Sequence, residues 1–506
     1  MSDDSVRAAL RSDHQLVVVE APAGCGKTHQ GADYARELAE AGGHGRPLIL
    51  THTHAARSVF ADRTKEASAK VEIRTIDSLI ANIAAAYHVG LGIPADTAAW
   101  VRQQEDGYAM LAQKVAILLT RHPMIAAALA RRYPVVICDE HQDSSGDQHA
   151  VVMAMLAASA KLRVFADPMQ SIFRDKVLAG SRPRWDWAGL RISADVYEEL
   201  DFPHRWKDGC PDLGKWSLGA RRSLLKEEPI DLRTGRPTSL EVIVAENLAD
   251  RNLDYRLSKD DRKPVDRFEQ GQSSLLILTH YNETARSFRG FFKRRVPLWE
   301  GHTRSALERL VEGMNGAKGD SSGLAKAVVS FMGDVGKGFS PSAFGNDFVR
   351  EATEGCTKRR SGKPATIQSL ARHVVDDPSH RGVSKVLTRI GVLKKSDAAF
   401  SEVEVDHYSE FHDAIRLGDF ENIEEGLAEI THRRTYSRPQ RPEKAISTIH
   451  KAKGLECDSV IVMPCNAKTF PDNHEARCLL YVALSRAKKR LVLVVSREKP
   501  SPLFVM

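Results

Sequence analysis

The feature that most constrains this chain is a short segment near its N-terminus, where an apolar run leads directly into a glycine-rich turn. Residues Leu16-Val-Val-Val19 are typical of a buried strand in a parallel sheet. The turn Ala21-Pro-Ala-Gly-Cys-Gly-Lys27-Thr28 follows, and a helical stretch extends from His29 to Glu40. A strand, a turn of this composition and a helix, in this order, predict a phosphate-binding P-loop.

Each part of this turn has a physical reason to bind a nucleotide. Gly24 and Gly26 allow backbone N–H groups to surround phosphate oxygens at a helix N-terminus, where the helix dipole also favours anions. We expect Lys27 to reach the β- and γ-phosphates of ATP and the Thr28 hydroxyl to hold Mg²⁺. The predicted nucleotide-binding residues of the loop are Ala23, Gly24, Cys25, Gly26, Lys27 and Thr28.

A P-loop requires an acidic partner on a neighbouring strand. The apolar run Tyr133-Pro-Val-Val-Ile-Cys138 ends in Asp139 and Glu140. We expect Asp139 to bind Mg²⁺ through water, and Glu140 to orient or deprotonate the attacking water. By itself, such a pair is often the start of a solvated loop. After a P-loop, it predicts the acidic pair of an enzyme that hydrolyses a nucleoside triphosphate with Mg²⁺.

Composition limits the class of protein but does not identify a binding partner. At roughly 100–200 residues per domain, the 506 residues predict two to four domains. The net charge of +7 permits a polyanion but does not require one. Seven scattered cysteines without a CxxC pair argue against a disulfide framework or a zinc site. No apolar run approaches the ~20 residues that span a bilayer, and the N-terminus is polar, so we expect a cytoplasmic protein without a membrane partner.

Further short motifs follow one another along the chain. They are Thr51-His-Thr-His-Ala-Ala56, Arg74-Thr75-Ile-Asp-Ser78, Asp139-Glu-His-Gln-Asp143, Ala166-Asp-Pro-Met-Gln170-Ser-Ile-Phe173, Phe202-Pro-His-Arg205, Ser447-Thr-Ile-His450-Lys-Ala-Lys-Gly-Leu-Glu456-Cys-Asp458 and Leu480-Tyr-Val-Ala-Leu-Ser-Arg486-Ala-Lys488. In kind and order they resemble the motifs of superfamily 1 DNA helicases of the UvrD/Rep type. That family also begins its P-loop with alanine, as Ala21 does here.

The resemblance implies roles for residues around the nucleotide. Gln170 is expected to sense the γ-phosphate through its amide, and Glu456 to approach the ribose. Arg205 and Arg486 are expected to act as arginine fingers from the second motor domain, because phosphoryl transfer is accelerated by guanidinium groups at the developing charge. Gln15 directly precedes the first strand and is a doubtful equivalent of the family's adenine-reading glutamine, so the choice of nucleotide stays open.

The contacts with nucleic acid are predicted more weakly. Thr51, His54 and Thr75 follow strands, at the sheet edge where α/β proteins bind ligands. By resemblance they would contact phosphates of a single strand. Phe173 is expected to stack on a base, although a core phenylalanine is an equal alternative. His450 resembles a histidine near the strand path, and a lone histidine of this kind is more often structural.

The expected fold class is α/β, with two RecA-like P-loop domains whose parallel sheets are flanked by helices, and with mostly helical insertions of the 1B and 2B types. Domain 1A takes residues 1–80 and 131–195, and the 1B insertion takes 81–130. Domain 2A takes residues 196–295 and 441–506, and the 2B-type insertion takes 296–440. The charged stretch from Ser258 to Gln272 predicts a surface loop.

The function expected from these motifs is an ATP-dependent translocase and helicase on single-stranded or partly duplex DNA. The resemblance implies 3′→5′ movement, in DNA repair, recombination or phage defence. The alternative is a nucleic-acid-sensing NTPase subunit that regulates or recruits a nuclease partner without robust unwinding. Size and motif set also resemble the helicase-like subunit of Gabija-type antiphage systems. A third candidate function is a small-molecule phosphotransferase. The later motifs would have no role in such an enzyme, so the sequence does not favour it.

Overall fold

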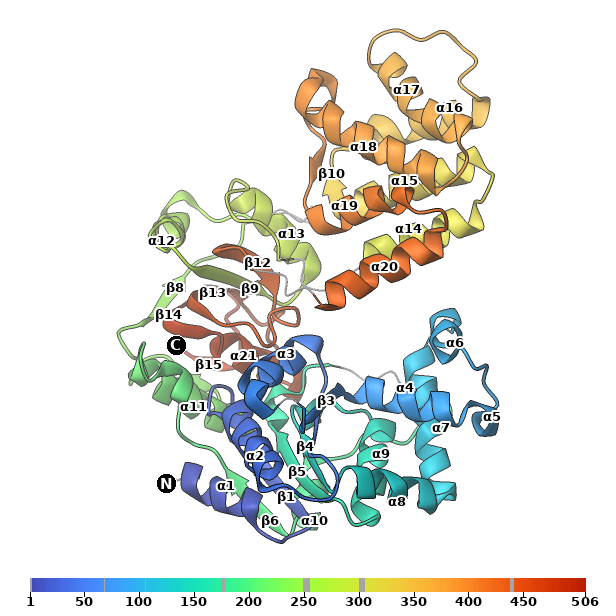
Figure 1. Cartoon of the computed structure of the whole chain (residues 1–506). Helices are drawn as coiled ribbons and strands as arrows, with labels where there is room; N and C mark the ends of the chain where they lie inside the picture. The colour runs from blue at the N-terminus through green and yellow to red at the C-terminus, as the bar shows by residue number, and fades with distance from the viewer. Residues whose placement is uncertain are drawn as a thin grey trace. The chain divides into compact units, whose positions relative to one another are not determined.

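In the computed structural model, the chain divides into two units, Met1–Lys293 with Ile446–Met506, and Arg294–Ala445. The structure describes residues 2–67, 69–104, 106–173, 178–248, 255–299, 305–436 and 441–506. Figure 1 shows the helices and strands along the chain. None of the described helices has the length and hydropathy to cross a membrane.

The first unit contains two sheets of parallel strands. The first sheet has the strand order β3-β2-β4-β5-β1-β6, and every neighbouring pair is parallel. Its strands are β1 (Leu16–Glu20), β2 (Leu48–Thr51), β3 (Glu72–Thr75), β4 (Val135–Cys138), β5 (Lys161–Ala166) and β6 (Val196–Glu199). Strand β6 pairs with β1, so the first sheet extends past the boundary at residue 195 that the sequence predicts.

Helices cover both faces of the first sheet (Figure 1). Because side chains alternate along a strand, Val17 and Val19 lie in one core and Leu16 and Val18 in the other. The first core is closed by α1 (Ser2–Arg11), α2 (Lys27–Ala41) and α3 (His54–Arg63). The second is closed by α4 (Ile76–Ala86), α6 (Thr97–Gln103), α7 (Gly107–Arg121), α8 (Pro123–Arg132), α9 (Gly146–Ala157) and α10 (Trp187–Ser193), with the short α5 (His88–Leu91) beside them.

The second sheet has the strand order β12-β9-β13-β14-β8. Its strands are β8 (Leu240–Val244), β9 (Leu275–Thr279), β12 (Lys444–Thr448), β13 (Cys457–Cys465) and β14 (Ala487–Val495). Helices α11 (Pro211–Leu225), α12 (Lys259–Gln270), α13 (Asn282–Phe291) and α21 (His474–Leu484) accompany it, and β7 (Ile230–Asp231) pairs with β15 (Phe504–Val505). The expected α/β class, with parallel sheets flanked by helices, is confirmed.

Helix α12 corrects the loop predicted for residues 258–272. The Ser258 hydroxyl accepts a hydrogen bond from the backbone N–H of Asp261 at 3.1 Å and so caps the helix. Asp260 and Asp261 in the first turn suit the positive end of the helix dipole. Val265 and Phe268, three residues apart, are its buried apolar side chains. Two apolar positions among many charges are too few to reveal a helical period in the sequence.

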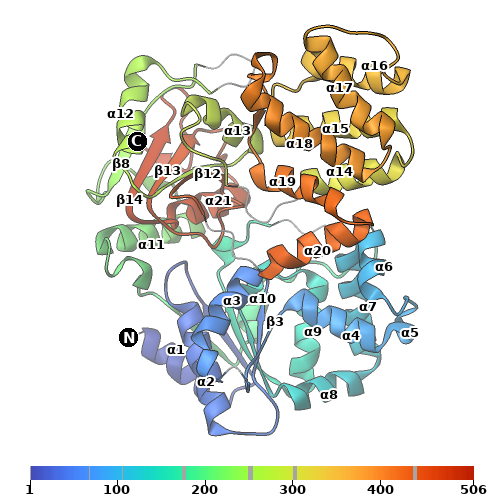
Figure 2. The same cartoon turned by 45° about the horizontal axis from the view of Figure 1, so that its top comes forward.

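The second unit, residues 294–445, is mainly helical (Figure 2). Its helices are α14 (Ser305–Gly316), α15 (Ser321–Val335), α16 (Asn346–Glu354), α17 (Lys363–Asp376), α18 (His380–Ser396), α19 (Tyr408–Arg416) and α20 (Ile423–Tyr436), with a short antiparallel pair of β10 (Gly336–Lys337) and β11 (Glu404–Val405). These helices enclose one apolar core that includes Leu324, Phe331, Phe348 and Leu387.

Candidate nucleotide and nucleic-acid site

The P-loop connects β1 to α2 and packs tightly against neighbouring chain. Gly24 and Gly26 have φ values of 77° and 90°, a conformation that glycine adopts without strain. A Cβ atom at Gly24 would lie 2.8 Å from Arg205 Cβ and 2.8 Å from a ring atom of Trp206. Both backbone conformation and space therefore require glycine at this position. Burial raises the pKa of the Cys25 thiol to about 12, so the thiol stays protonated and contributes packing.

Lys27, at the start of α2, donates a hydrogen bond to the carboxylate of Glu140. Burial disfavours the charged ammonium, but the carboxylates of Glu140 and Asp139 outweigh burial and raise the pKa of Lys27. Burial likewise disfavours the Glu140 carboxylate, and Lys27 and Lys453 lower its pKa below the usual range. The P-loop lysine and the acidic pair are thus in direct contact.

Asp139 has the character expected of a magnesium ligand. Its Oδ1 atom is buried and has no hydrogen-bond partner among the described residues. Burial raises the pKa of Asp139 to about 7, despite the Lys27 ammonium nearby. A buried carboxylate oxygen without a hydrogen-bond partner among the described residues, together with the Thr28 hydroxyl in the first turn of α2, fits the oxygen ligands that Mg²⁺ prefers.

The described residues contain no group of three or more His, Cys, Asp and Glu side chains that could hold a metal ion.

The short helix η3 (Pro168–Gln170) brings Gln170 beside the acidic pair. The Gln170 amide donates to Asp167 at 2.8 Å, and the side chain is buried. Gln142 connects the two segments, because its amide nitrogen donates to Glu140 and its amide oxygen accepts from the backbone N–H of Asp167 at 3.0 Å. A change at Gln170 can therefore reach Glu140 through Gln142.

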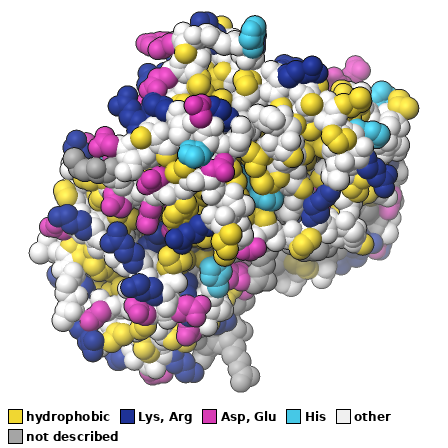
Figure 3. All heavy atoms as spheres, turned by 90° about the horizontal axis from the view of Figure 1, so that it is seen from below, with side chains coloured by type: hydrophobic (Ala, Val, Ile, Leu, Met, Phe, Trp, Pro, Cys, Tyr) yellow, Lys and Arg dark blue, Asp and Glu magenta, His cyan; other side chains and the backbone are white. Residues whose placement is uncertain are grey.

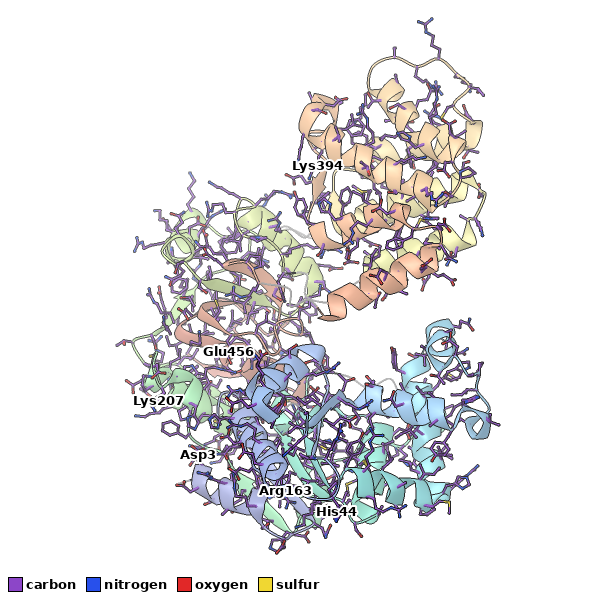
Figure 4. All side chains as sticks on the ribbon, viewed as in Figure 1. Asp3, His44, Arg163, Lys207, Lys394 and Glu456 are labelled. Carbon is purple, nitrogen blue, oxygen red and sulfur yellow. The ribbon has the colours of Figure 1, made fainter. Side chains whose placement is uncertain are left out.

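The structure brings Arg205, Arg486 and Glu456 together around Ser485. Arg205 donates to the Ser485 carbonyl at 2.6 Å and forms an ion pair with Glu456 at 2.7 Å; Figure 4 labels Glu456. Arg486 donates to Ser485 Oγ at 2.7 Å and to the Val482 carbonyl at 2.8 Å. Burial, and then the charge of Arg205, lower the pKa of Arg486 to about 10.

Arg205 follows a strand of the first sheet and not of the second. It lies in η4 (His204–Trp206), directly after β6 of the first sheet, and its backbone N–H donates to the Gly24 carbonyl at 3.0 Å. The sequence predicts that both arginines come from the second motor domain, whereas Arg205 follows a strand of the first sheet. Its Nε atom is buried without a partner among the described residues, which leaves one donor of the guanidinium available beside the P-loop.

Sequence analysis assigned no role to three side chains that complete this site. Tyr481 accepts a hydrogen bond from the backbone N–H of Ala23 at 2.8 Å. Lys453 donates to both oxygens of Asp143, at 2.7 and 2.6 Å, and to the Gln170 carbonyl at 2.7 Å. Tyr481 and Lys453 lie within two of the motifs named above, so the sequence could have indicated that both belong to this site.

Arg221 is the third of these side chains. It lies in α11, is 2% exposed, and pairs with Glu20 and Asp167. Burial opposes its charge, but Asp167 and Glu20 raise the pKa well above the usual range. Arg221 carries no local signal, because an arginine in an amphipathic helix is usually exposed.

The predicted phosphate contacts of Thr51 and Thr75 are not open hydroxyl groups. Thr51 is fully buried, and its hydroxyl contacts the carbonyls of Thr53 at 3.3 Å and Arg74 at 3.4 Å. The Thr75 hydroxyl caps α4 by accepting from the backbone N–H of Ser78 at 3.2 Å. Both threonines thus shape the ends of strands β2 and β3. His54 begins α3, and its side chain lies outside the described residues.

Phe173 is 43% exposed, so the alternative of a core phenylalanine is wrong. Its ring centroid lies 6.2 Å from that of His450, which in turn lies 5.7 Å from His280. His280 stacks on Tyr281 at 4.2 Å. The sequence did not single out His280 and Tyr281, although both directly follow the apolar strand β9. The four rings form an aromatic row, defined as Phe173, His450, His280 and Tyr281.

The net positive charge does not gather into one patch on the face shown in Figure 3, where Lys and Arg side chains are interspersed with Asp and Glu. On this face, therefore, no broad positively charged surface indicates that a polyanion binds. The aromatic row offers a different means of binding, because bases stack on aromatic rings regardless of their sequence.

Two protein-family models match the chain. The UvrD/REP helicase N-terminal domain matches residues 97–176, which include Asp139, Glu140 and Gln170. The UvrD-like helicase C-terminal domain matches residues 400–498, which include Glu456 and Arg486. No curated protein sequence matches the chain.

Proposed function

The chain belongs to the UvrD/Rep-like helicases, and on that premise we propose that it is an ATP-dependent translocase and helicase on single-stranded DNA, moving 3′→5′. In this proposal the two sheets of the first unit are the sheets of two RecA-like motor domains. The residues around the P-loop hydrolyse ATP, and the aromatic row contacts the strand. The comparisons lend no support to a nuclease partner or to the Gabija-type resemblance, so neither is part of the proposal.

In this proposal Asp139 and Glu140 have different roles, because their surroundings differ. Bound Mg²⁺ would neutralise phosphate charge and would be held by Asp139 and Thr28. Glu140 keeps a low pKa beside Lys27 and Lys453, so it is ionised and able to accept a hydrogen bond from the attacking water. When phosphates occupy the P-loop, Lys27 exchanges its contact with Glu140 for contact with phosphate oxygens, which frees Glu140 for this role.

The arginines supply positive charge to the transferred phosphoryl group. Arg486 is buried and its charged form is disfavoured, so a phosphate nearby stabilises a charge that the protein alone holds at a cost. Arg205 has a free Nε donor beside Gly24. Both guanidinium groups therefore gain interactions as negative charge develops on the γ-phosphate.

One contact connects hydrolysis to the second sheet, and it is the observation that carries the proposal. Lys453, between β12 and β13, bonds both to Asp143, three residues after Glu140, and to the carbonyl of Gln170. Its ammonium also lies 5.1 Å from the Phe173 ring. One side chain thus touches the segment after the acidic pair, the segment of the predicted γ-phosphate sensor and the aromatic row.

The proposal is tested by ATP hydrolysis and strand displacement with the purified chain. We expect single-stranded DNA to stimulate ATP hydrolysis, and duplexes with a 3′ single-stranded tail to be unwound in preference to those with a 5′ tail. Glu140→Gln should lower turnover by about 10²–10⁴-fold while nucleotide binding remains, because a positioned general base contributes this much. The exposed Lys489→Ala variant serves as the control.

Hydrolysis that no nucleic acid stimulates would contradict the proposal. Stimulation without displacement of either tailed duplex would instead support the alternative of a nucleic-acid-sensing NTPase.

A further inference from the structure

Three histidines, one buried and two half-buried, lie together on the side of the acidic pair that faces β2. His52 follows β2, His141 lies in η2 (His141–Asp143) directly after Glu140, and His149 lies in α9. His141 is 2% exposed, and Ser144, which lies among the three rings, is fully buried. None of these four side chains belongs to the nucleotide site described above.

The four side chains form one continuous hydrogen-bonded chain. His52 Nε2 lies 3.0 Å from Ser144 Oγ, and Ser144 Oγ lies 3.2 Å from His141 Nδ1. His141 Nε2 lies 2.9 Å from His149 Nδ1. Three bonds therefore lead from the end of β2 to helix α9 and pass through the residue beside Glu140. We refer to His52, Ser144, His141 and His149 as the histidine chain.

The topology of the sheet explains why residues so distant in sequence meet. Strands β2 and β4 are parallel neighbours, with Leu50 opposite Cys138, and the backbone N–H of Asp139 donates to the Leu50 carbonyl at 2.8 Å. The residues after both strands therefore emerge at the same edge of the sheet. Ser145 then starts α9 with a capping box, which places His149 one turn into the helix.

Trp185 fixes the histidine chain from outside. Its indole N–H donates to the Ser144 carbonyl at 3.1 Å. Its ring lies 5.0 Å from the His141 ring and stacks on the His149 ring at 5.1 Å. The neighbouring Arg184 donates to the Gln142 carbonyl at 2.6 Å. The segment after Glu140 therefore has contacts on both of its sides, through Trp185 and Arg184.

The hydrogen bonds along the histidine chain depend on one another. Burial lowers the pKa of His52 and His149 to about 4, so both rings are neutral near pH 7. A neutral imidazole donates from one nitrogen and accepts at the other. When the Ser144 hydroxyl accepts from one histidine and donates to the other, all three bonds can run in one direction along the chain. A change of tautomer at His52 then changes the bond that Ser144 offers to His141.

We propose that the histidine chain is a positioning relay that couples the strand end at Thr51 to Glu140. A strand bound at the end of β2 displaces or turns His52, the connected bonds shift His141, and Glu140 beside it adjusts its position relative to the attacking water. The relay rests on the proposed function, because it concerns how nucleic acid stimulates hydrolysis. The four side chains are positioning residues, and none of them touches the nucleotide.

The test compares two variants at His149, which lies outside every motif. His149→Phe keeps a ring against Trp185 but removes both nitrogens. His149→Asn places an amide group at the position of Nδ1 and so retains a partner for His141. We expect His149→Phe to lose stimulation of hydrolysis by single-stranded DNA by about tenfold or more, within the range of typical coupling energies. Hydrolysis without DNA should stay within about twofold, and His149→Asn should restore most of the stimulation.

Further measurements separate a relay from a defect in folding or binding. Ser144→Ala should reproduce the loss. Ser193→Ala should not, because the Ser193 hydroxyl donates to the Leu190 carbonyl of its own helix, α10, and does not contact the histidine chain. DNA affinity by fluorescence anisotropy and thermal unfolding temperature should match those of the unchanged chain. Equal loss of hydrolysis with and without DNA, or unchanged stimulation in His149→Phe, would overturn the relay. Absence of stimulation in the unchanged chain would overturn the proposed function instead.

Discussion

The two parallel sheets of the first unit present opposite chemistry at the ends of their strands. The first sheet ends in carboxylates and their partners, with Asp139 and Glu140 after β4 and Asp167 after β5. The second sheet is followed by His280 after β9 and Lys453 after β12, and Arg486 precedes β14. Similar folds thus serve different tasks, because the edge residues rather than the strands determine what each sheet binds.

Burial disfavours a charge on each side. It raises the pKa of Asp139 to about 7 and lowers that of Arg486 to about 10. A nucleotide with Mg²⁺ carries the two missing partners, a cation for the carboxylate and an anion for the guanidinium. These two pKa shifts are the ones expected if the site binds a ligand that carries both charges, as the proposed nucleotide with Mg²⁺ does.

The largest effect is expected from the second sheet. Arg486→Ala should lower kcat for ATP hydrolysis by about 10³-fold, because arginine fingers contribute this much to phosphoryl transfer. The KM for ATP should change far less, since the arginine acts on charge that develops in the transition state. Steady-state kinetics checks both values, with Lys489→Ala as a control at an exposed position of β14. A kcat within threefold of the unchanged chain would remove Arg486 from the site.

The second largest effect on ATP hydrolysis is expected from a residue that follows the first sheet's strand β1. Lys27→Ala should reduce hydrolysis by about 10²–10³-fold, because it removes a preorganised donor to the phosphates. It also leaves Glu140 without its Lys27 partner, so nucleotide binding should weaken together with turnover. Calorimetric titration with ATP and Mg²⁺ measures the binding. Loss of turnover with full binding would show that Lys27, like Arg486, acts mainly in the transition state, and the two sheets would then not differ in this respect.

A smaller effect is expected at the aromatic row. Phe173→Ala should weaken binding of single-stranded DNA by about 1–3 kcal/mol, the amount typical of one base–aromatic stack. Phe173→Trp should preserve the affinity because it retains a stacking face. Fluorescence anisotropy with a labelled oligonucleotide checks both variants. Equal affinities for the alanine and tryptophan variants would show that Phe173 does not stack on a base.

The smallest effect concerns the neutral rings at the first sheet. The pKa values of His52 and His149 are lowered from 6.5 to about 4 by burial. Since the folded state disfavours protonation, their stabilisation is complete above pH 6.5 and is lost as the pH falls toward 4. Between pH 7.5 and 5, the unfolding free energy should fall by roughly 1–2 kcal/mol for each ring.

Denaturant unfolding at the two pH values measures this loss. His149→Asn should show a shallower pH dependence than the unchanged chain, because one titrating ring is gone. An identical pH dependence in both proteins would show that His149 is not buried as the structure places it.

Sequence reasoning succeeded where one segment contains its own signal. Strands β1, β4 and β9 are continuous apolar runs because both faces of their sheets are covered. It failed at α12, whose buried face consists of Val265 and Phe268 among charged residues. It also placed β6 beyond the first sheet, because pairing with β1 depends on residues about 180 positions away.

Some residues of the candidate site could be predicted from a local sequence pattern, and others could not. The roles of Lys27, Asp139, Glu140 and Arg486 rest on local patterns and stay predictions for experiment. The exposure of Phe173 excludes a core position, and its stacking on a base stays a prediction. Thr51 and Thr75 are buried, and their hydroxyls have partners within the chain; their contact with nucleic acid stays a prediction.

The sequence by itself determined the class of fold and predicted the phosphate-binding loop and the acidic pair, because each depends on the chemistry and period of neighbouring residues. The tertiary structure alone decided which distant side chains meet. Lys453 contacts Asp143 across 310 positions, and Arg205 forms its ion pair with Glu456. The histidine chain likewise exists because β2 and β4 are adjacent. Such contacts depend on sheet order and burial, which no short stretch of sequence contains.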